Sequence, residues 1–115
     1  MRNKVIVGKM LDYCSCIIKR SSTIDTDGQR LSTDMEIFKL FAFDLMQLGE
    51  LASKLDESFR NECTHIPWSQ IRGLRNRIVH GYGDINTDIV WETIVASIPD
   101  LCGQLTELYE SINGR

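Results

Sequence analysis

The chain has 115 residues, a length that suits one domain around one hydrophobic core, with 43 % hydrophobic and 25 % charged residues as in ordinary globular proteins. Its formal net charge of −3 argues against a general nucleic-acid binder, so no DNA binding is expected. The longest uninterrupted apolar run, residues 40–43, is far too short to cross a bilayer, and the first residues lack an apolar signal stretch.

Apolar residues recur at helical spacing through the first half of the chain. Residues 3–20 are predicted to form a helix, and the polar residues 21–30, which include Asp27-Gly28, are predicted to form a loop. Ser32 or Thr33 could cap the next helix, with Glu36 three residues after Thr33 as in a capping box. That helix is predicted to reach about Leu55, with an apolar stripe at Ile37, Phe41, Leu45, Leu48 and Leu51/Ala52.

The second half begins with residues 56–65, which are polar and are predicted to be irregular. A helix over 67–80 follows, with Pro67 in its first turn and Gly81 as its stop. Asn86 or Thr87 could cap a further helix carrying Ile89, Val90, Ile94 and Val95. Pro99 predicts a kink or a restart, before a last helix over 99–112. No strand-like alternation persists, so residues 1–115 are predicted to form one all-α domain, an antiparallel bundle of four to five helices.

Charge and cysteine are unevenly distributed. Residues 1–20 hold five basic side chains against one acidic, residues 60–80 hold four against one, and residues 81–114 hold six acids and no Lys or Arg. The two basic regions could attract a phosphate chain at one place, or they could be ordinary helix-surface charges. The cysteines lack zinc-site spacing and are predicted to be reduced thiols in a cytoplasmic protein; they are Cys14, Cys16, Cys63 and Cys102.

Polar side chains with chemical capacity crowd the end of the helix predicted over 67–80. Asn76 and His80 are four residues apart and share a face, which Arg72 also shares with Asn76. Arg75 lies five residues before His80, about 140° around an ideal helix. The length of an Arg side chain and unwinding at Gly81 could bring Arg75 and His80 to one phosphate. A second copy of the helix across a two-fold axis would make this easier.

This set of residues suits the cleavage of RNA without a metal or any other cofactor. His80 could be the base for the 2′-hydroxyl or the acid for the leaving oxygen, because histidine titrates near neutral pH. Arg75 would neutralise charge that grows on the phosphorane, and Asn76 would orient the ribose, the phosphate or His80. Arg72 and Arg77 would bind phosphate. A structural role stays open, since a lone histidine near a helix end is often a cap or a dipole partner.

The run Arg75-Asn-Arg-Ile-Val-His-Gly-Tyr82 has the form R-x4-H-x-Y. It is accompanied in order by Leu48-Gly-Glu-Leu-Ala52, Ile66-Pro-Trp68 and Asp88-Ile-Val-Trp-Glu92. In these segments the sequence resembles the HepT-like proteins, a branch of the HEPN superfamily. The similarity spans nearly the whole chain and is densest from about 45 to 105. Residues 17–34 match no family segment, and Glu50 matches a family position to which no chemistry can be assigned.

The resemblance implies a homodimeric helical bundle that acts as the toxin of a type II toxin–antitoxin pair, a metal-independent endoribonuclease. Arg75 and His80 would be catalytic, with Asn76 in support, in a cleft made by both subunits. The expected partner is a minimal nucleotidyltransferase, MNT, which would silence the toxin by transferring AMP from ATP onto Tyr82. AMP would add negative charge and bulk beside Arg75 and His80 and repel RNA. The alternative is a non-catalytic subunit that binds substrate or nucleotide for the nucleotidyltransferase.

Overall fold

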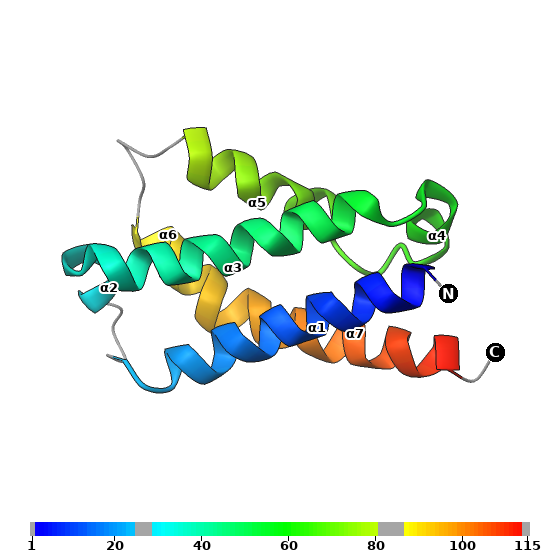
Figure 1. The fold of residues 1–115 in the computed structure, drawn as a ribbon, viewed down its shortest axis with the longest axis horizontal. Helices are drawn as coiled ribbons and strands as arrows, with labels where there is room; N and C mark the ends of the chain where they lie inside the picture. Colours follow the sequence, from blue (N-terminus) through cyan, green and yellow to red (C-terminus); the bar gives the residue numbers. More distant parts are fainter. Residues whose placement is uncertain (1, 25–28, 81–86, 114–115) are drawn as a thin grey trace.

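The computed structural model describes residues 2–24, 29–80 and 87–113, and each regular element in those ranges is helical. Four long helices, α1, α3, α5 and α7, run along the longest dimension of the molecule, which measures 46 Å (Figure 1). Helix α3 packs against α1 and α5, and α1 also packs against α7. The bounds are α1 Arg2–Ser21, α2 Gln29–Thr33, α3 Met35–Lys54, α4 Glu57–Glu62, α5 Trp68–His80, α6 Thr87–Glu92, the π-helical turn η1 Thr93–Ser97, and α7 Ile98–Asn113. The predicted all-α bundle is confirmed.

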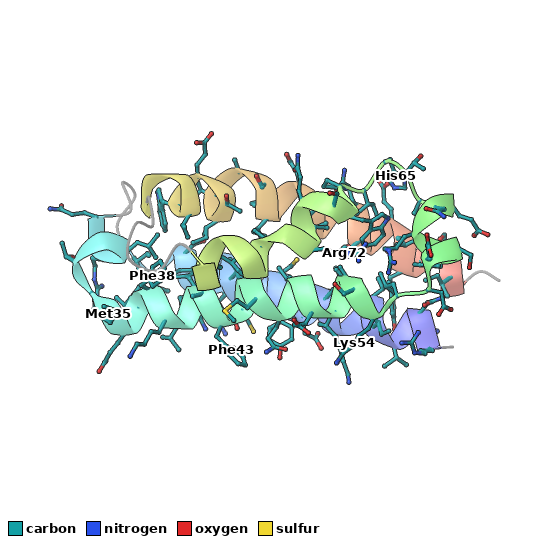
Figure 2. All side chains as sticks on the ribbon, turned by 90° about the horizontal axis from the view of Figure 1, so that it is seen from above. Met35, Phe38, Phe43, Lys54, His65 and Arg72 are labelled. Atoms are coloured by element: carbon teal, nitrogen blue, oxygen red, sulfur yellow. The ribbon has the colours of Figure 1, made fainter. Side chains whose placement is uncertain are left out.

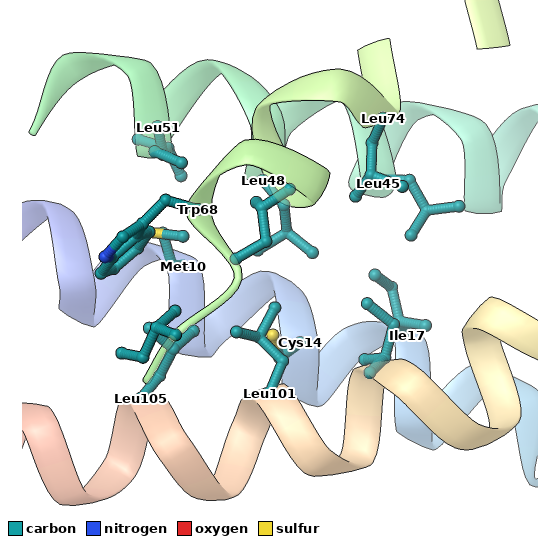
Figure 3. Close-up of a cluster of buried hydrophobic side chains, with 14 of the residues drawn as sticks. Met10, Cys14, Ile17, Leu45, Leu48, Leu51, Trp68, Leu74, Leu101 and Leu105 are labelled. Carbon is teal, nitrogen blue, oxygen red and sulfur yellow. The ribbon is translucent and has the colours of Figure 1, made fainter. Parts of the chain in front are cut away.

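The hydrophobic core lies where the four long helices meet. The stripe predicted on α3 is confirmed at Phe41, Leu45 and Leu48, each at most 1 % exposed, whereas Ile37 is only partly buried. Burying each such side chain contributes about 1.5–3 kcal/mol to folding. Figure 3 shows the cluster that these helices share, which contains Met10, Cys14 and Ile17 from α1, Leu45, Leu48 and Leu51 from α3, Trp68 and Leu74 from α5, and Leu101 and Leu105 from α7. The core therefore fixes the face that α5 turns inward.

The cap of α3 differs from the prediction. Ser32 and Thr33 belong to the short helix α2, so neither is the cap. Asp34 has extended backbone angles, and its carboxylate accepts hydrogen bonds from the backbone N–H groups of Glu36 at 3.1 Å and Ile37 at 3.3 Å. An aspartate cap satisfies orphan donors of the first turn and places negative charge at the positive end of the helix.

Helix α4 occupies residues that were predicted to be irregular. None of its side chains is fully buried, and Phe59 alone of its apolar residues is partly buried against the core, so no apolar period marks it in the sequence. Its Arg60 guanidinium instead donates hydrogen bonds to the backbone carbonyls of Ala52, at 3.0 Å, and of Leu55. These carbonyls lie at the C-terminal end of α3, where the last acceptors lack the regular helical partner four residues on, and the Ala52 carbonyl also accepts from the Leu55 backbone N–H at 3.3 Å. Arg60 thereby ties α4 to the end of α3.

The break that Pro99 predicts takes the form of a wide helical turn. Pro99 is the second residue of α7, and η1 comes directly before that helix. The backbone N–H of Ile98 bonds the carbonyl of Thr93, five residues earlier, which is the π-helical pattern. Ile94 is fully buried in this turn, whereas Val95, which was expected on the apolar face, is 47 % exposed. Val95 thus lies on the solvent side of the turn, and the chain continues as α7.

The cysteines behave as the sequence predicts, since no disulfide joins any of the four, all of which lie in the described ranges. Cys14 is fully buried. Burial, and to a smaller extent the neighbouring Cys102, raises the pKa of the Cys14 thiol from 9.0 to about 12. The thiol stays protonated at neutral pH, so Cys14 acts as a small apolar core residue and not as a nucleophile.

Candidate functional site

The inner face of α5 is anchored in the bundle. Trp68, Ile71, Leu74 and Ile78 recur at three- and four-residue steps, and each is at most 8 % exposed. The Trp68 indole Nε1 donates a hydrogen bond to the backbone carbonyl of Cys63 at 3.0 Å, which satisfies the polar edge of a buried ring. Helix α5 is therefore held in one orientation against α3.

The outer face of α5 carries the positions to which the sequence assigns chemistry. Positions 72, 76 and 80 follow one another at four-residue steps, opposite the buried stripe. Position 75 lies about 140° around the helix from position 80 and about 7.5 Å from it along the helix axis, at about 1.5 Å per residue. The backbone of α5 thus places both members of the proposed pair on one helix.

The side chains of the proposed pair are not among those described. Arg75, Asn76, Arg77 and His80 belong to α5, but their side chains lie outside the described residues, and Tyr82 lies outside them entirely. The meeting of Arg75 and His80 therefore stays a prediction.

Arg72 is the described cation on this face. Its side chain is exposed, and its Nε donates a long hydrogen bond to the Ser53 hydroxyl of α3 at 3.4 Å. Among the described residues no carboxylate lies within ion-pair distance of Arg72. Figure 2 shows Arg72 in the half of the bundle that holds His65 and α4. Its charge is available to a ligand.

Much of the basic region at residues 1–20 serves the fold. The Arg20 guanidinium lies 2.6 Å from the buried Asp44 carboxylate and also lies over the Phe41 ring, 5.3 Å from its centre. Arg2 pairs with Asp56 at 3.0 Å, and Lys4 lies over the Tyr109 ring. Three of the five cations of this region thus have partners within the chain.

Sequence reasoning missed an open groove beside the N-terminal half of α5. It is formed where α4 meets α5 and has a volume of about 540 Å³. Arg72 lines it together with polar side chains from the α4 segment. The segment has no apolar period, so only its density of amide and hydroxyl side chains could have drawn attention to it. Glu50, the family position without an assigned role, is partly buried on α3.

The described residues give no sign of two other kinds of site. No helix in the described ranges is both long enough and apolar enough to span a membrane. Within the same ranges no three His, Cys, Asp or Glu side chains are grouped so that they could hold a metal ion.

The fold and the sequence together define an all-α protein of the HEPN-like class. The family model described as ribonuclease HepT-like matches residues 10–108, so the chain belongs to the HepT-like ribonuclease family. The matched stretch contains the whole of α5. Membership of this family indicates that the chain is a ribonuclease, and RNA is the substrate that this implies.

Individual relatives agree with the family match. A protein of Caldanaerobacter subterraneus subsp. tengcongensis, named as a candidate RNase, is 31 % identical over 101 residues, which cover 88 % of each chain. A candidate RNase of Methanocaldococcus jannaschii is 28 % identical over 92 residues, 80 % of this chain and 76 % of the relative. A probable ribonuclease HepT of Thermococcus cleftensis is 26 % identical over 61 residues, 53 % of this chain and 56 % of the relative. No solved structure matches the chain significantly.

Proposed function

We propose that the protein is the toxin of a type II toxin–antitoxin pair and cleaves RNA internally without a metal ion. The observation that carries this proposal is the family match over residues 10–108, because it encloses the R-x4-H positions on a helix whose inner face is anchored in the core. The whole chain would act as one domain in the reducing cytoplasm, which suits four cysteines that form no disulfide.

In the proposed reaction the 2′-hydroxyl of the ribose attacks the adjacent phosphorus. The P–O5′ bond breaks, and the products are a 2′,3′-cyclic phosphate and a 5′-hydroxyl end. A base takes the proton of the 2′-hydroxyl, and an acid gives a proton to the leaving 5′-oxygen. His80 takes one of these parts, and in a two-fold dimer the second His80 is available for the other. Arg75 stabilises the charge on the phosphorane, Asn76 orients the reacting groups, and Arg72 and Arg77 bind neighbouring phosphates.

The function is tested with the purified wild-type chain and a structured RNA in excess EDTA. The expected result is cleavage at the same rate as without chelator, and fragments whose 5′ ends accept phosphate from a kinase without prior dephosphorylation. Activity that disappears in EDTA would contradict metal independence. Intact RNA under all conditions would contradict the ribonuclease proposal itself.

The proposed partner is an MNT-type nucleotidyltransferase that transfers AMP onto Tyr82. Tyr82 is two residues beyond His80, so AMP there adds negative charge close to the positions that must bind a phosphate. We expect the chain to gain the mass of one or more AMP units when it is co-expressed with such a partner and ATP. Intact-mass measurement checks this; a gain that persists in the matched variant Tyr82→Phe would mean that another residue is modified.

The proposed assembly is a homodimer with the two α5 helices near the two-fold axis. Such a dimer brings two sets of positions 75 and 80 to one cleft, which a single α5 cannot do. Light scattering at micromolar concentration is expected to give the mass of two chains, and a monomer would contradict the shared cleft.

A second candidate function is a non-catalytic subunit that binds nucleotide for the transferase. The net charge of −3 favours it, because it weakens the long-range attraction of RNA. So do the contacts that Arg2, Lys4 and Arg20 make with other side chains of the chain. In that case the purified protein would bind ATP or AMP and cut no RNA.

A further inference from the structure

The groove between α4 and α5 has the size and the chemistry of a small-ligand site. Its volume of about 540 Å³ falls within the usual range for such sites. Asn61, Thr64, Ser69 and Arg72 are exposed and line it, which gives an amide, two hydroxyls and a guanidinium. These groups suit the phosphate, the ribose hydroxyls and the base edges of a nucleotide.

The walls of the groove are held in place by hydrogen bonds within the chain, which exist before any ligand binds. The Arg60 guanidinium lines the groove but also donates to the carbonyls of Ala52 and Leu55, which keeps α4 against α3. The buried Trp68 ring forms part of the lining, with its Nε1 bonded to the Cys63 carbonyl. A pre-formed site of this kind loses little conformational entropy when a ligand binds.

Arg72 is the cation in the groove that can turn to a ligand. Its contact with the Ser53 hydroxyl is long, at 3.4 Å, and it has no carboxylate partner among the described residues. Glu57 also lines the groove and disfavours a phosphate near its carboxylate. A phosphate in the groove would therefore settle on the Arg72 side.

The groove lies in line with the R-x4-H positions. Arg72 precedes position 80 by eight residues on the same helix, which is about 12 Å along the axis at about 1.5 Å per residue. The strands of duplex DNA advance about 3.4 Å per nucleotide, so a stacked strand of similar rise would cover this separation with a few nucleotides.

We propose that the groove between α4 and α5 binds a nucleotide of single-stranded RNA a few nucleotides from the bond that is cut. Arg72 binds its phosphate, and Asn61, Thr64 and Ser69 hydrogen-bond its ribose or base. This inference rests on the ribonuclease function proposed above and adds a strand-binding subsite to it. The site makes the enzyme prefer substrates long enough to fill both the cleft and the groove.

The test measures RNA binding by the full chain with His80→Ala, so that the RNA is not consumed, using the anisotropy of a dye-labelled octanucleotide and of a dinucleotide. Arg72→Ala and Asn61→Ala should each weaken octanucleotide binding by about tenfold, or about 1.4 kcal/mol, and weaken dinucleotide binding less, because a dinucleotide is too short to fill both the cleft and the groove. Arg72→Ala should also lower the slope of log affinity against log salt by about 0.7, the value for one phosphate contact on a single strand.

The matched control is Lys39→Ala. It removes one positive charge from an exposed position of α3 that is about 21 Å from Ser53 along the helix, far from the groove. Lys39→Ala should leave both affinities unchanged. An equal loss in Lys39→Ala and Arg72→Ala would mean that only overall charge matters, and would overturn the subsite.

Other outcomes separate this inference from the proposed function. One outcome is that the wild type cleaves RNA but Arg72→Ala binds the octanucleotide as tightly as the His80→Ala parent. This result would overturn the groove as an RNA-binding site and leave the proposed ribonuclease function intact. Length-dependent, Arg72-dependent binding without any cleavage supports the groove and overturns the nuclease. AMP that competes for the groove as tightly as the octanucleotide binds it would make this a free-nucleotide site and overturn the strand-binding proposal.

Discussion

Replacing His80 with alanine is expected to lower the rate of RNA cleavage by about 10²–10⁴-fold, because the proposed mechanism loses a group that transfers a proton in the transition state. The matched control is His65→Ala, since the chain has two histidines. His65 is exposed between α4 and α5, and its contact with Gln104 is made by the backbone carbonyl, which the substitution keeps. His65→Ala is expected to cleave at the wild-type rate.

The decisive measurement is the single-turnover cleavage rate of one labelled RNA by the wild type and the two variants, in chelator. Equal cleavage by the wild type and His80→Ala would remove His80 from the mechanism. Arg75→Lys extends the experiment, because lysine keeps the charge but loses the two-pronged guanidinium. We expect Arg75→Lys to fall between the wild type and Arg75→Ala, and Arg75→Lys as poor as Arg75→Ala would mean that charge alone is not the requirement.

The second large effect concerns stability. Arg20→Met is expected to lower the free energy of unfolding by about 3 kcal/mol, because it leaves a buried carboxylate without its cation. Asp44 is 6 % exposed and lies 2.6 Å from the Arg20 guanidinium, which is also partly buried against Phe41. Urea unfolding of the wild type and the variant at one protein concentration measures the difference.

A double variant separates the ion pair from the packing around it. Arg20→Met combined with Asp44→Leu replaces both charges with apolar groups, and it is expected to recover most of the loss, since no buried charge remains. A double variant that loses the sum of the two single effects would mean that Arg20 and Asp44 stabilise the fold independently of each other.

The long helices could be predicted from the sequence because each has an apolar stripe that the core buries. Phe41, Leu45 and Leu48 mark α3, and Ile71, Leu74 and Ile78 mark α5; the predicted ends of these helices are correct to within about two residues. Helices α2 and α4 could not be predicted, since they have few residues and α4 depends on contacts made by Arg60 with a different helix. Ser32, Thr33 and Asp34 are all good N-cap residue types, so the sequence alone does not choose among them. Asp34 is the cap because α2 includes Ser32 and Thr33.

Only part of the candidate site, likewise, could be predicted from the sequence. Helical spacing places positions 72, 76 and 80 on one face of α5, and the structure confirms the helix that this requires. The groove could not be predicted, because Asn61 and Thr64 come to Ser69 and Arg72 only through the chain reversal between α4 and α5. No local pattern encodes the side chains that meet there.

The π-helical turn at Thr93–Ser97 amounts to one residue inserted into what would otherwise be an unbroken helix from Thr87 to Asn113. The extra residue is absorbed inside the turn: Val90 before it and Ile98 after it are eight residues apart, and both side chains contact the same core. Next to Pro99 the helix can therefore contain one residue more without rotating the buried faces on either side of the turn. Homologues that are one residue shorter at this point would have a regular turn there and the same packing on either side of it.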